Sequence, residues 1–148
     1  MNIRCTLKKN SDFRRLYSKG KSAVTPFMVV YCRRNGLDHN RVGYTVSTKL
    51  GHAVVRNRVR RRLREIYRLN SHQLKTGWDI VIVARSRCVG AEYSRMDAAF
   101  MAACEKLSLR RRSREEIHAR RHPLLSAQDI SRASALLPLH PDLFAIRA

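Results

Sequence analysis

The sequence predicts an α+β protein, a two-layer α/β sandwich in which helices pack on one small mixed sheet. Apolar residues recur with a helical period in three segments, 11–18, 53–69 and 94–109. Four other segments have the β-branched and aromatic composition of strands, 22–24, 27–34, 41–48 and 79–85. These segments give the order αβββαβα. Because 44% of the residues are hydrophobic, one core of ordinary size is expected.

The first helix, predicted at 11–18, has one apolar face, since Phe13, Leu16 and Tyr17 recur at i, i+3 and i+4. Ser11 or Asn10 can cap its start. The strand at 27–34 (FMVVYCRR) is followed by the turn cluster NGLDHN and by the strand at 41–48. The short spacing predicts that these two strands pair as an antiparallel hairpin.

The second helix, 53–69, also has an apolar face, made by Val55, Val59, Leu63, Ile66 and Tyr67. The apolar run DIVIVAR at 79–85 predicts a strand that is buried on both sides. In the third helix, 94–109, the spacing of Ser94 and Asp97 is that of a capping box.

The charge is large and unevenly distributed. The chain holds 31 Lys and Arg residues, 24 of them Arg, against 11 Asp and Glu, for a net charge of +20. Residues 1–112 hold 26 cations and 7 acids, whereas residues 113–148 hold 5 cations and 4 acids. We therefore expect a domain at 1–112 that binds a polyanion, and a C-terminal extension at 113–148 that packs loosely.

Several classes of protein are not expected from this sequence. No apolar run approaches the roughly 18 residues of a membrane span. The four cysteines have no CxxC spacing, and Cys32 and Cys104 fall in apolar patterns, which fits a reducing cytoplasm. No zinc, phosphate-loop or hydrolase motif occurs, so an autonomous enzyme is not expected.

The helix at 53–69 is the strongest functional signal. Six of the nine residues 56–64 are Arg, and no acid occurs between His39 and Glu65, so neighbouring carboxylates cannot neutralise the run. This pattern indicates a nucleic-acid contact. A helical wheel gives one outward face to Asn57, Arg58, Arg60, Arg61, Arg64 and Arg68. Asn57 can bond a base or a sugar, or it can bond neighbouring backbone.

Irregular or A-form RNA suits this helix better than DNA does. Its flanking elements are strands, and no helix-turn-helix, zipper or zinc pattern occurs, so a DNA partner is not expected. Four aromatic residues near cations could stack the bases of a single strand, or could simply be core: Phe13, Tyr17, Phe27 and Tyr31.

Three blocks of sequence carry a family resemblance. They are LKKNSDFRRLYSKGKS at 7–22, RVGYTVSTKLGHAVVRNRVRRRLREIYR at 41–68 and WDIVIVAR at 78–85. The second block contains R-N-R-x-R-R-x-x-R at 56–64, preceded by V-S-x-K-x-G-x-A-V at 46–54. In order and spacing these blocks resemble the bacterial ribonuclease P protein component. The departures are mild: Thr48 stands where Lys is common, and Tyr17 stands where Phe is common.

The resemblance implies a fold like the second domain of ribosomal protein S5, with the arginine-rich helix as a crossover between strands. It implies the accessory subunit of a ribonucleoprotein endonuclease that removes the 5′ leader from precursor tRNA. The catalytic RNA subunit would carry out the hydrolysis and would hold the Mg²⁺, and no protein residue would be catalytic.

The resemblance also assigns two sets of site residues. The leader of the precursor tRNA would contact Phe13, Tyr17, Phe27 and Tyr31. The RNA subunit would contact Lys49, Arg56, Asn57, Arg58, Arg60, Arg61, Arg62, Arg64 and Arg68. The alternatives are a ribosomal or assembly scaffold protein that plays no part in cleavage, and a cationic DNA-binding regulator.

Overall fold

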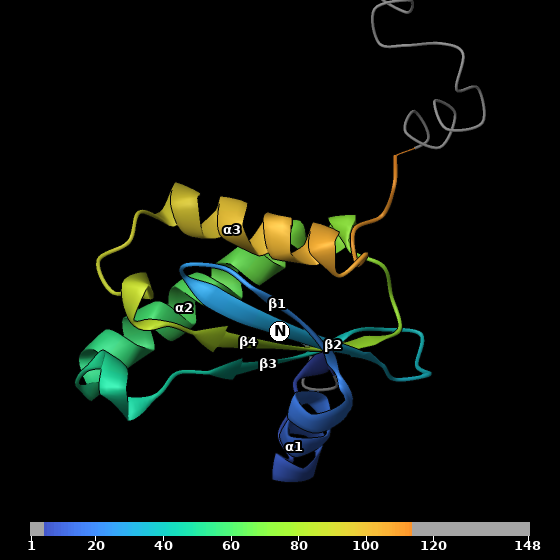
Figure 1. Cartoon of the computed structure of the whole chain (residues 1–148), viewed down its shortest axis with the longest axis horizontal. Helices are drawn as coiled ribbons and strands as arrows, with labels where there is room; N and C mark the ends of the chain where they lie inside the picture. The colour runs from blue at the N-terminus through green and yellow to red at the C-terminus, as the bar shows by residue number, and fades with distance from the viewer. Residues whose placement is uncertain (1–4, 114–148) are drawn as a thin grey trace, which may run out of the picture. The chain divides into compact units, whose positions relative to one another are not determined.

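The computed structural model describes residues 5–113, which form a four-stranded mixed sheet with helices packed on it (Figure 1). The helices are α1 (Asn10–Lys19), α2 (Ala53–Asn70) and α3 (Tyr93–Lys106). The strands are β1 (Lys21–Val24), β2 (Met28–Arg34), β3 (Arg41–Thr45) and β4 (Trp78–Ala84). Three short 3₁₀ helices lie at Thr48–Leu50, Ser71–Gln73 and Ser86–Cys88. The predicted α+β class and the order αβββαβα are confirmed.

The backbone contacts group Met1–Arg111 into one unit, which contains nearly all of the described residues. The extension predicted at 113–148 lies outside the described residues except for Ser113. In the part that the structure describes, no helix is both long enough and apolar enough to cross a membrane.

The strands are arranged in the order β1-β2-β4-β3. β2 pairs antiparallel with both β1 and β4, and β3 pairs parallel with β4. The hairpin predicted between the strands at 27–34 and 41–48 is therefore wrong, because β4 lies between β2 and β3. The two parallel neighbours β3 and β4 are connected through α2, as a crossover requires.

The composition of the strands explains this order. β4 contributes Ile80, Val81 and Ile82, all fully buried, so it needs cover on both faces and takes a central position. β3 contains Arg41, Gly43 and Thr45, which tolerate an edge. The Asn35–Gly36 pair does form a local turn, since the Asn35 side chain accepts a hydrogen bond from the backbone N–H of Leu37 at 2.8 Å.

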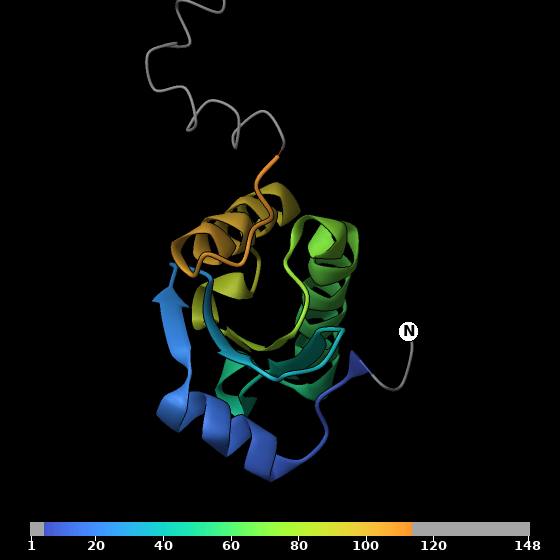
Figure 2. The same cartoon turned by 90° about the vertical axis from the view of Figure 1, so that its right-hand side faces the viewer.

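The helices cover both faces of the sheet (Figures 1 and 2). α2 and α3 pack on one face over the main core, which includes Leu63, Ile66 and Phe100. α1 packs on the other face, where Leu7, Leu16 and Val81 form a smaller core. Helix α1 therefore adds a partial third layer to the predicted sandwich.

Two predicted helix caps are wrong. α1 follows Lys9 and α3 follows Glu92, and neither of these residues makes a capping hydrogen bond with its side chain. The carboxylate of Asp97, which was expected to take part in the cap of the third helix, instead accepts a hydrogen bond from the Asn70 side chain at the end of α2. Tertiary packing of α2 against α3 thus overrides the local sequence signal.

All four cysteines are unpaired, and three of them are buried: Cys32, Cys88 and Cys104. Desolvation by burial raises the pKa of the Cys32 thiol to about 11 and that of Cys104 to about 12. It also raises the pKa of Cys88. The predicted core positions of Cys32 and Cys104 are confirmed.

The native protein should therefore show one reactive thiol. At about pH 8 the three buried thiols stay protonated and screened, so a disulfide-exchange reagent should modify Cys5 alone until the protein unfolds. Stopped-flow thiol titration measures this, with Cys5→Ser as the control that should abolish the fast phase. Rapid modification of a second thiol in the folded protein would contradict the described packing.

Candidate nucleic-acid interface

Helix α2 divides its side chains between the core and the surface. Val59, Leu63, Ile66 and Tyr67 are buried against the sheet and α3. The predicted apolar face is confirmed except at its start, where Val55 is only half-buried. Four arginines on the helix are exposed, namely Arg58, Arg61, Arg64 and Arg68, whereas Arg56, Arg60 and Arg62 are half-buried.

Some of these arginines have partners within the protein. Arg62 donates from Nη1 to the backbone carbonyl of Ala91 at 2.8 Å, so it ties α2 to the segment before α3. Arg68 pairs with Glu65 in a two-point contact, which holds the pKa of the Glu65 carboxyl below its usual range. The Nε atom of Arg56 is buried without a hydrogen-bond partner in the described part of the chain.

Arg58 and Arg61 differ from these three. Both are exposed, and neither has an ion pair or side-chain hydrogen bond among residues 5–113. Asn57, between Arg56 and Arg58, accepts a hydrogen bond from Arg60 at 3.3 Å, a partner that sequence reasoning did not consider. Arg64 is also exposed without an ion pair or hydrogen bond among the described residues, but its guanidinium lies over the ring of Tyr44. Arg58 and Arg61 are therefore the exposed members of the arginine run that have none of these contacts, and their donors are available to an outside anion.

Lys49 lies on the 3₁₀ helix Thr48–Leu50, just before α2, and its side chain is exposed. Ser47 starts this turn, because its side chain accepts a hydrogen bond from the backbone N–H of Lys49 at 3.3 Å. Gly51 then adopts φ = 138°, a conformation that favours glycine, and the chain turns into α2. The predicted strand 41–48 accordingly ends at Thr45.

A second surface is formed by aromatic rings between α1 and the sheet. Tyr17 is 41% exposed, and its ring meets Tyr31 edge-on with the centroids 5.0 Å apart. The ring of Phe13 lies 6.5 Å from that of Tyr17. Phe13 and Tyr31 also pack against the small core on this face, so each is both a core residue and a wall of the surface.

Phe27 does not join this group. It packs against the main core on the α2 and α3 side of the sheet, and the Arg95 guanidinium lies 5.7 Å above its ring. Phe27 precedes β2, so the alternation of side chains within that strand does not govern its direction. The prediction that one groove between the first helix and the sheet contains all four aromatic residues is wrong at this position.

The aromatic surface and the arginine-rich helix meet at a hollow of about 430 Å³. Its lining comes from α1, the end of β3 and α2: Asn10, Phe13, Arg14, Tyr17, Tyr44, Thr45, Val46 and Arg60. β3 is an edge strand, so elements on opposite faces of the sheet can both reach its end. Residues 6–7 cover this edge only near Val42, through a bridge from Thr6.

Sequence reasoning missed five residues of this hollow: Asn10, Arg14, Tyr44, Thr45 and Val46. The Arg64 guanidinium lies 5.9 Å over the ring of Tyr44, and burial raises the pKa of the Tyr44 hydroxyl. The alternation of side chains along β3 could have predicted that Thr45 and Tyr44 point to opposite faces of the sheet. Only the strand order shows that both residues lie at an open edge.

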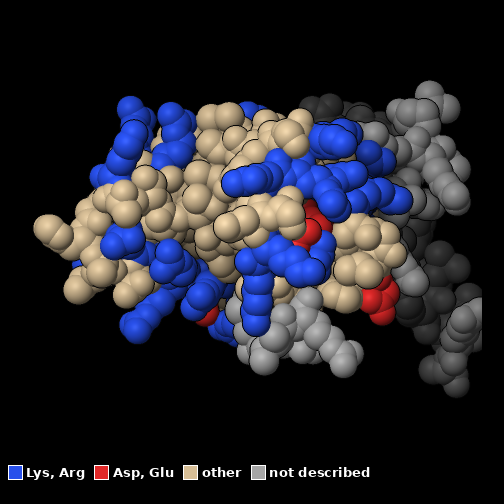
Figure 3. All heavy atoms as spheres, turned by 90° about the horizontal axis from the view of Figure 1, so that it is seen from below, with Lys and Arg blue, Asp and Glu red and all other residues tan. Residues whose placement is uncertain are grey.

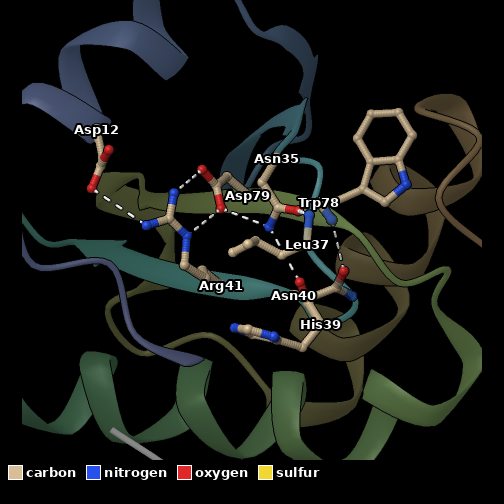
Figure 4. Close-up of polar contacts among 8 residues, drawn as sticks. All are labelled: Asp12, Asn35, Leu37, His39, Asn40, Arg41, Trp78 and Asp79. Atoms are coloured by element: carbon tan, nitrogen blue, oxygen red, sulfur yellow. Dashed lines mark hydrogen bonds and ion pairs between the residues drawn. The ribbon is translucent and has the colours of Figure 1, made fainter. Parts of the chain in front are cut away.

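Figure 3 looks at the molecule from the side that carries α1, and Lys and Arg far exceed Asp and Glu on this face. The acidic residue of α1, Asp12, forms an ion pair within the protein. It lies 3.7 Å from Arg41, which forms a two-point contact with Asp79 at 2.8 and 2.6 Å (Figure 4).

Among residues 5–113, no group of three or more His, Cys, Asp or Glu side chains could hold a metal ion.

The fold and these surfaces define a small basic α+β protein of the nucleic-acid-binding class. The family model for ribonuclease P matches residues 1–108. The ribonuclease P protein component of Alkaliphilus oremlandii is 46% identical over 103 residues, which cover 70% of this chain and 90% of that protein. The chain belongs to the ribonuclease P protein family.

Solved structures agree with this assignment. The ribonuclease P protein of Staphylococcus aureus superposes with a TM-score of 0.66 at 31% identity, over 72% of this chain and 98% of that one. The protein from Thermotoga maritima gives 0.61 at 31% identity, over 66% and 92% of the two chains. The resemblance stated from the sequence is confirmed, and with it an RNA-binding role in tRNA processing.

Proposed function

We propose that this protein is the accessory subunit of ribonuclease P and that it contacts two RNAs with two different surfaces. The arginine-rich face of α2 binds the catalytic RNA subunit, and the aromatic surface beside α1 binds the single-stranded 5′ leader of precursor tRNA. The observation that carries the proposal is the hollow at the end of β3, where Tyr17 from one surface and Arg60 from the other line the same space.

The α2 face suits a structured RNA because its positive charges can bind phosphates without any contact with base edges. Arg58 and Arg61 present unpaired guanidinium groups, and each can bind a phosphate through two N–H donors. Lys49, Asn57, Arg60 and Arg64 add donors beside them. Arg62 and Arg68 contribute less, since Ala91 and Glu65 already use part of their hydrogen-bonding capacity.

The aromatic surface suits an unpaired strand because unstacked bases can stack on exposed rings. Tyr17 is the most exposed of its three rings, and Arg14 and Arg60 lie at the same hollow to meet the phosphates. In this proposal Phe13 and Tyr31 support Tyr17 and form the walls, while Phe27 stays a core residue on the other side of the sheet.

The proposal assigns the hydrolysis and the Mg²⁺ to the RNA subunit. Magnesium would activate the water and stabilise the leaving oxygen there. The protein's own contribution is to bind and orient the precursor next to that RNA. The proposal includes a cytoplasmic location, which the four unpaired cysteines support.

Reconstitution tests this function. The full-length protein should increase cleavage of precursor tRNA by the ribonuclease P RNA at low Mg²⁺ concentration. A protein that binds the RNA yet leaves cleavage unchanged would be a scaffold, and the proposal would be wrong. A protein that prefers duplex DNA to both RNAs would contradict it as well.

Replacing an exposed arginine that has no partner within the protein should weaken the electrostatic contact with the RNA subunit. Arg58→Ala or Arg61→Ala should each reduce the salt dependence of binding by roughly one unit of slope in log Kd against log salt. Lys106→Ala on α3 is the control and should leave the slope unchanged. A slope that does not move in either arginine variant would argue against a phosphate contact.

Removal of the exposed ring should affect only the precursor. Tyr17→Ala should weaken binding of precursor tRNA to the reconstituted enzyme by about 1–3 kcal/mol, the usual contribution of one stacked base. Binding of mature tRNA should stay the same, because that RNA lacks the leader. Fluorescence titration with both RNAs measures the difference, and an equal loss for the two would mean that Tyr17 is structural.

A further inference from the structure

Helix α1 contacts β3 through three alternate residues of that strand, Arg41, Gly43 and Thr45. Successive side chains of a strand point to opposite faces, so these three share the face toward α1. Arg41 makes the first contact, with Asp12 at the start of α1, while Asp79 of β4 fixes its guanidinium from the other side (Figure 4). Asn35 also donates to Asp79 at 3.0 Å, which holds this arrangement in place.

The second contact is between Gly43 and the Phe13 ring of α1, and it requires that position 43 have no side chain. A Cβ atom built at this position would lie 2.7 Å from Cζ of Phe13, well inside van der Waals contact. The Phe13 ring therefore rests directly on the backbone of β3. Only a residue without a side chain at position 43 leaves room for this ring.

Thr45 makes the third contact, at the hollow itself. Its Oγ1 atom and the Tyr17 hydroxyl are 2.7 Å apart, a hydrogen bond between residues 28 positions apart in the sequence. Both residues line the hollow, and Tyr17 is partly exposed there. A Tyr side chain at such a position normally samples several rotamers, and ordering it has an entropic cost. The hydroxyl of Thr45 and the edge contact with Tyr31 together select one orientation.

We propose that Thr45 is a positioning residue for the single-stranded leader: its hydroxyl holds the Tyr17 ring in the orientation that stacks a base. Thr45 acts through Tyr17 and needs no contact of its own with the RNA. Arg41 and Gly43 place the helix, and Thr45 then places the ring. This inference rests on the proposed function, because it presumes that Tyr17 binds the leader.

Preorganisation of a ring raises affinity by removing an ordering cost from the binding step. The loss expected on removing the hydroxyl contact is therefore modest, roughly 2- to 10-fold in Kd. The effects of removing the Thr45 hydroxyl and the Tyr17 hydroxyl should depend on each other. Loss of Thr45's hydroxyl should matter only while Tyr17 carries its own hydroxyl, since neither hydroxyl makes another side-chain hydrogen bond among residues 5–113.

A double-mutant cycle on the full-length protein, reconstituted with the ribonuclease P RNA, tests this. Thr45→Val and Tyr17→Phe keep the shapes of both side chains and remove one hydroxyl each. Each single variant should raise the Kd for a leader-bearing precursor tRNA by roughly 2- to 10-fold, and the double variant by no more than either single one. The Kd for mature tRNA should not change.

The matched control is Thr76→Val, an exposed threonine in the segment before β4 that lies outside the hollow, and it should bind like the wild type. The inference is overturned if Thr45→Val leaves precursor binding unchanged, or if it costs as much in the Tyr17→Phe background as in the wild type. A wild-type enzyme that binds precursor and mature tRNA alike would overturn the leader-binding proposal first, so the two failures can be told apart.

Discussion

The two proposed RNA-binding surfaces of this protein depend on one constraint, the place of β3 at the edge of the sheet. Within the sheet β3 pairs only with β4; on its other side Thr6 bridges to Val42, and its far end at Tyr44–Val46 is open. Helix α1 packs on one face of the sheet and α2 on the other, so an aromatic surface and an arginine-rich surface would ordinarily be separated by the sheet. They come together only where β3 ends, and there the chain supplies Tyr17, Thr45 and Arg60 to one hollow.

β3 takes the edge because β4 takes the centre, and this follows from the residues. Ile80 and Ile82 face the main core while Val81 faces the small one, so β4 can satisfy its apolar side chains only between two neighbours. The crossover through α2 then brings the arginine run beside the end of β3. Arg41, paired with Asp79, fixes the register at the opposite end of the same two strands.

The element types and the cationic face of α2 could be predicted from the sequence because they rest on local periodicity. The strand order could not, since the Asn35–Gly36 turn is compatible with a hairpin and also with the observed loop, and only the burial demand of β4 decides between them. The helical wheel leaves Arg62 off the outward face that it gives to Arg58, but the partner of Arg62 could not be predicted, because the carbonyl of Ala91 lies 29 residues away. Phe27 was misplaced for a similar reason, because the guanidinium that lies over its ring comes from Arg95 of α3, far along the chain.

Site-specific photocrosslinking can show whether the two surfaces bind two different RNAs and meet at the end of β3. A photoreactive phenylalanine analogue placed at position 17 or at position 58 reports which RNA lies there in the reconstituted enzyme bound to precursor tRNA. The account predicts that position 17 crosslinks to the leader and position 58 to the RNA subunit. Crosslinks from both positions to the same RNA, or from position 17 to the body of the tRNA, would contradict it.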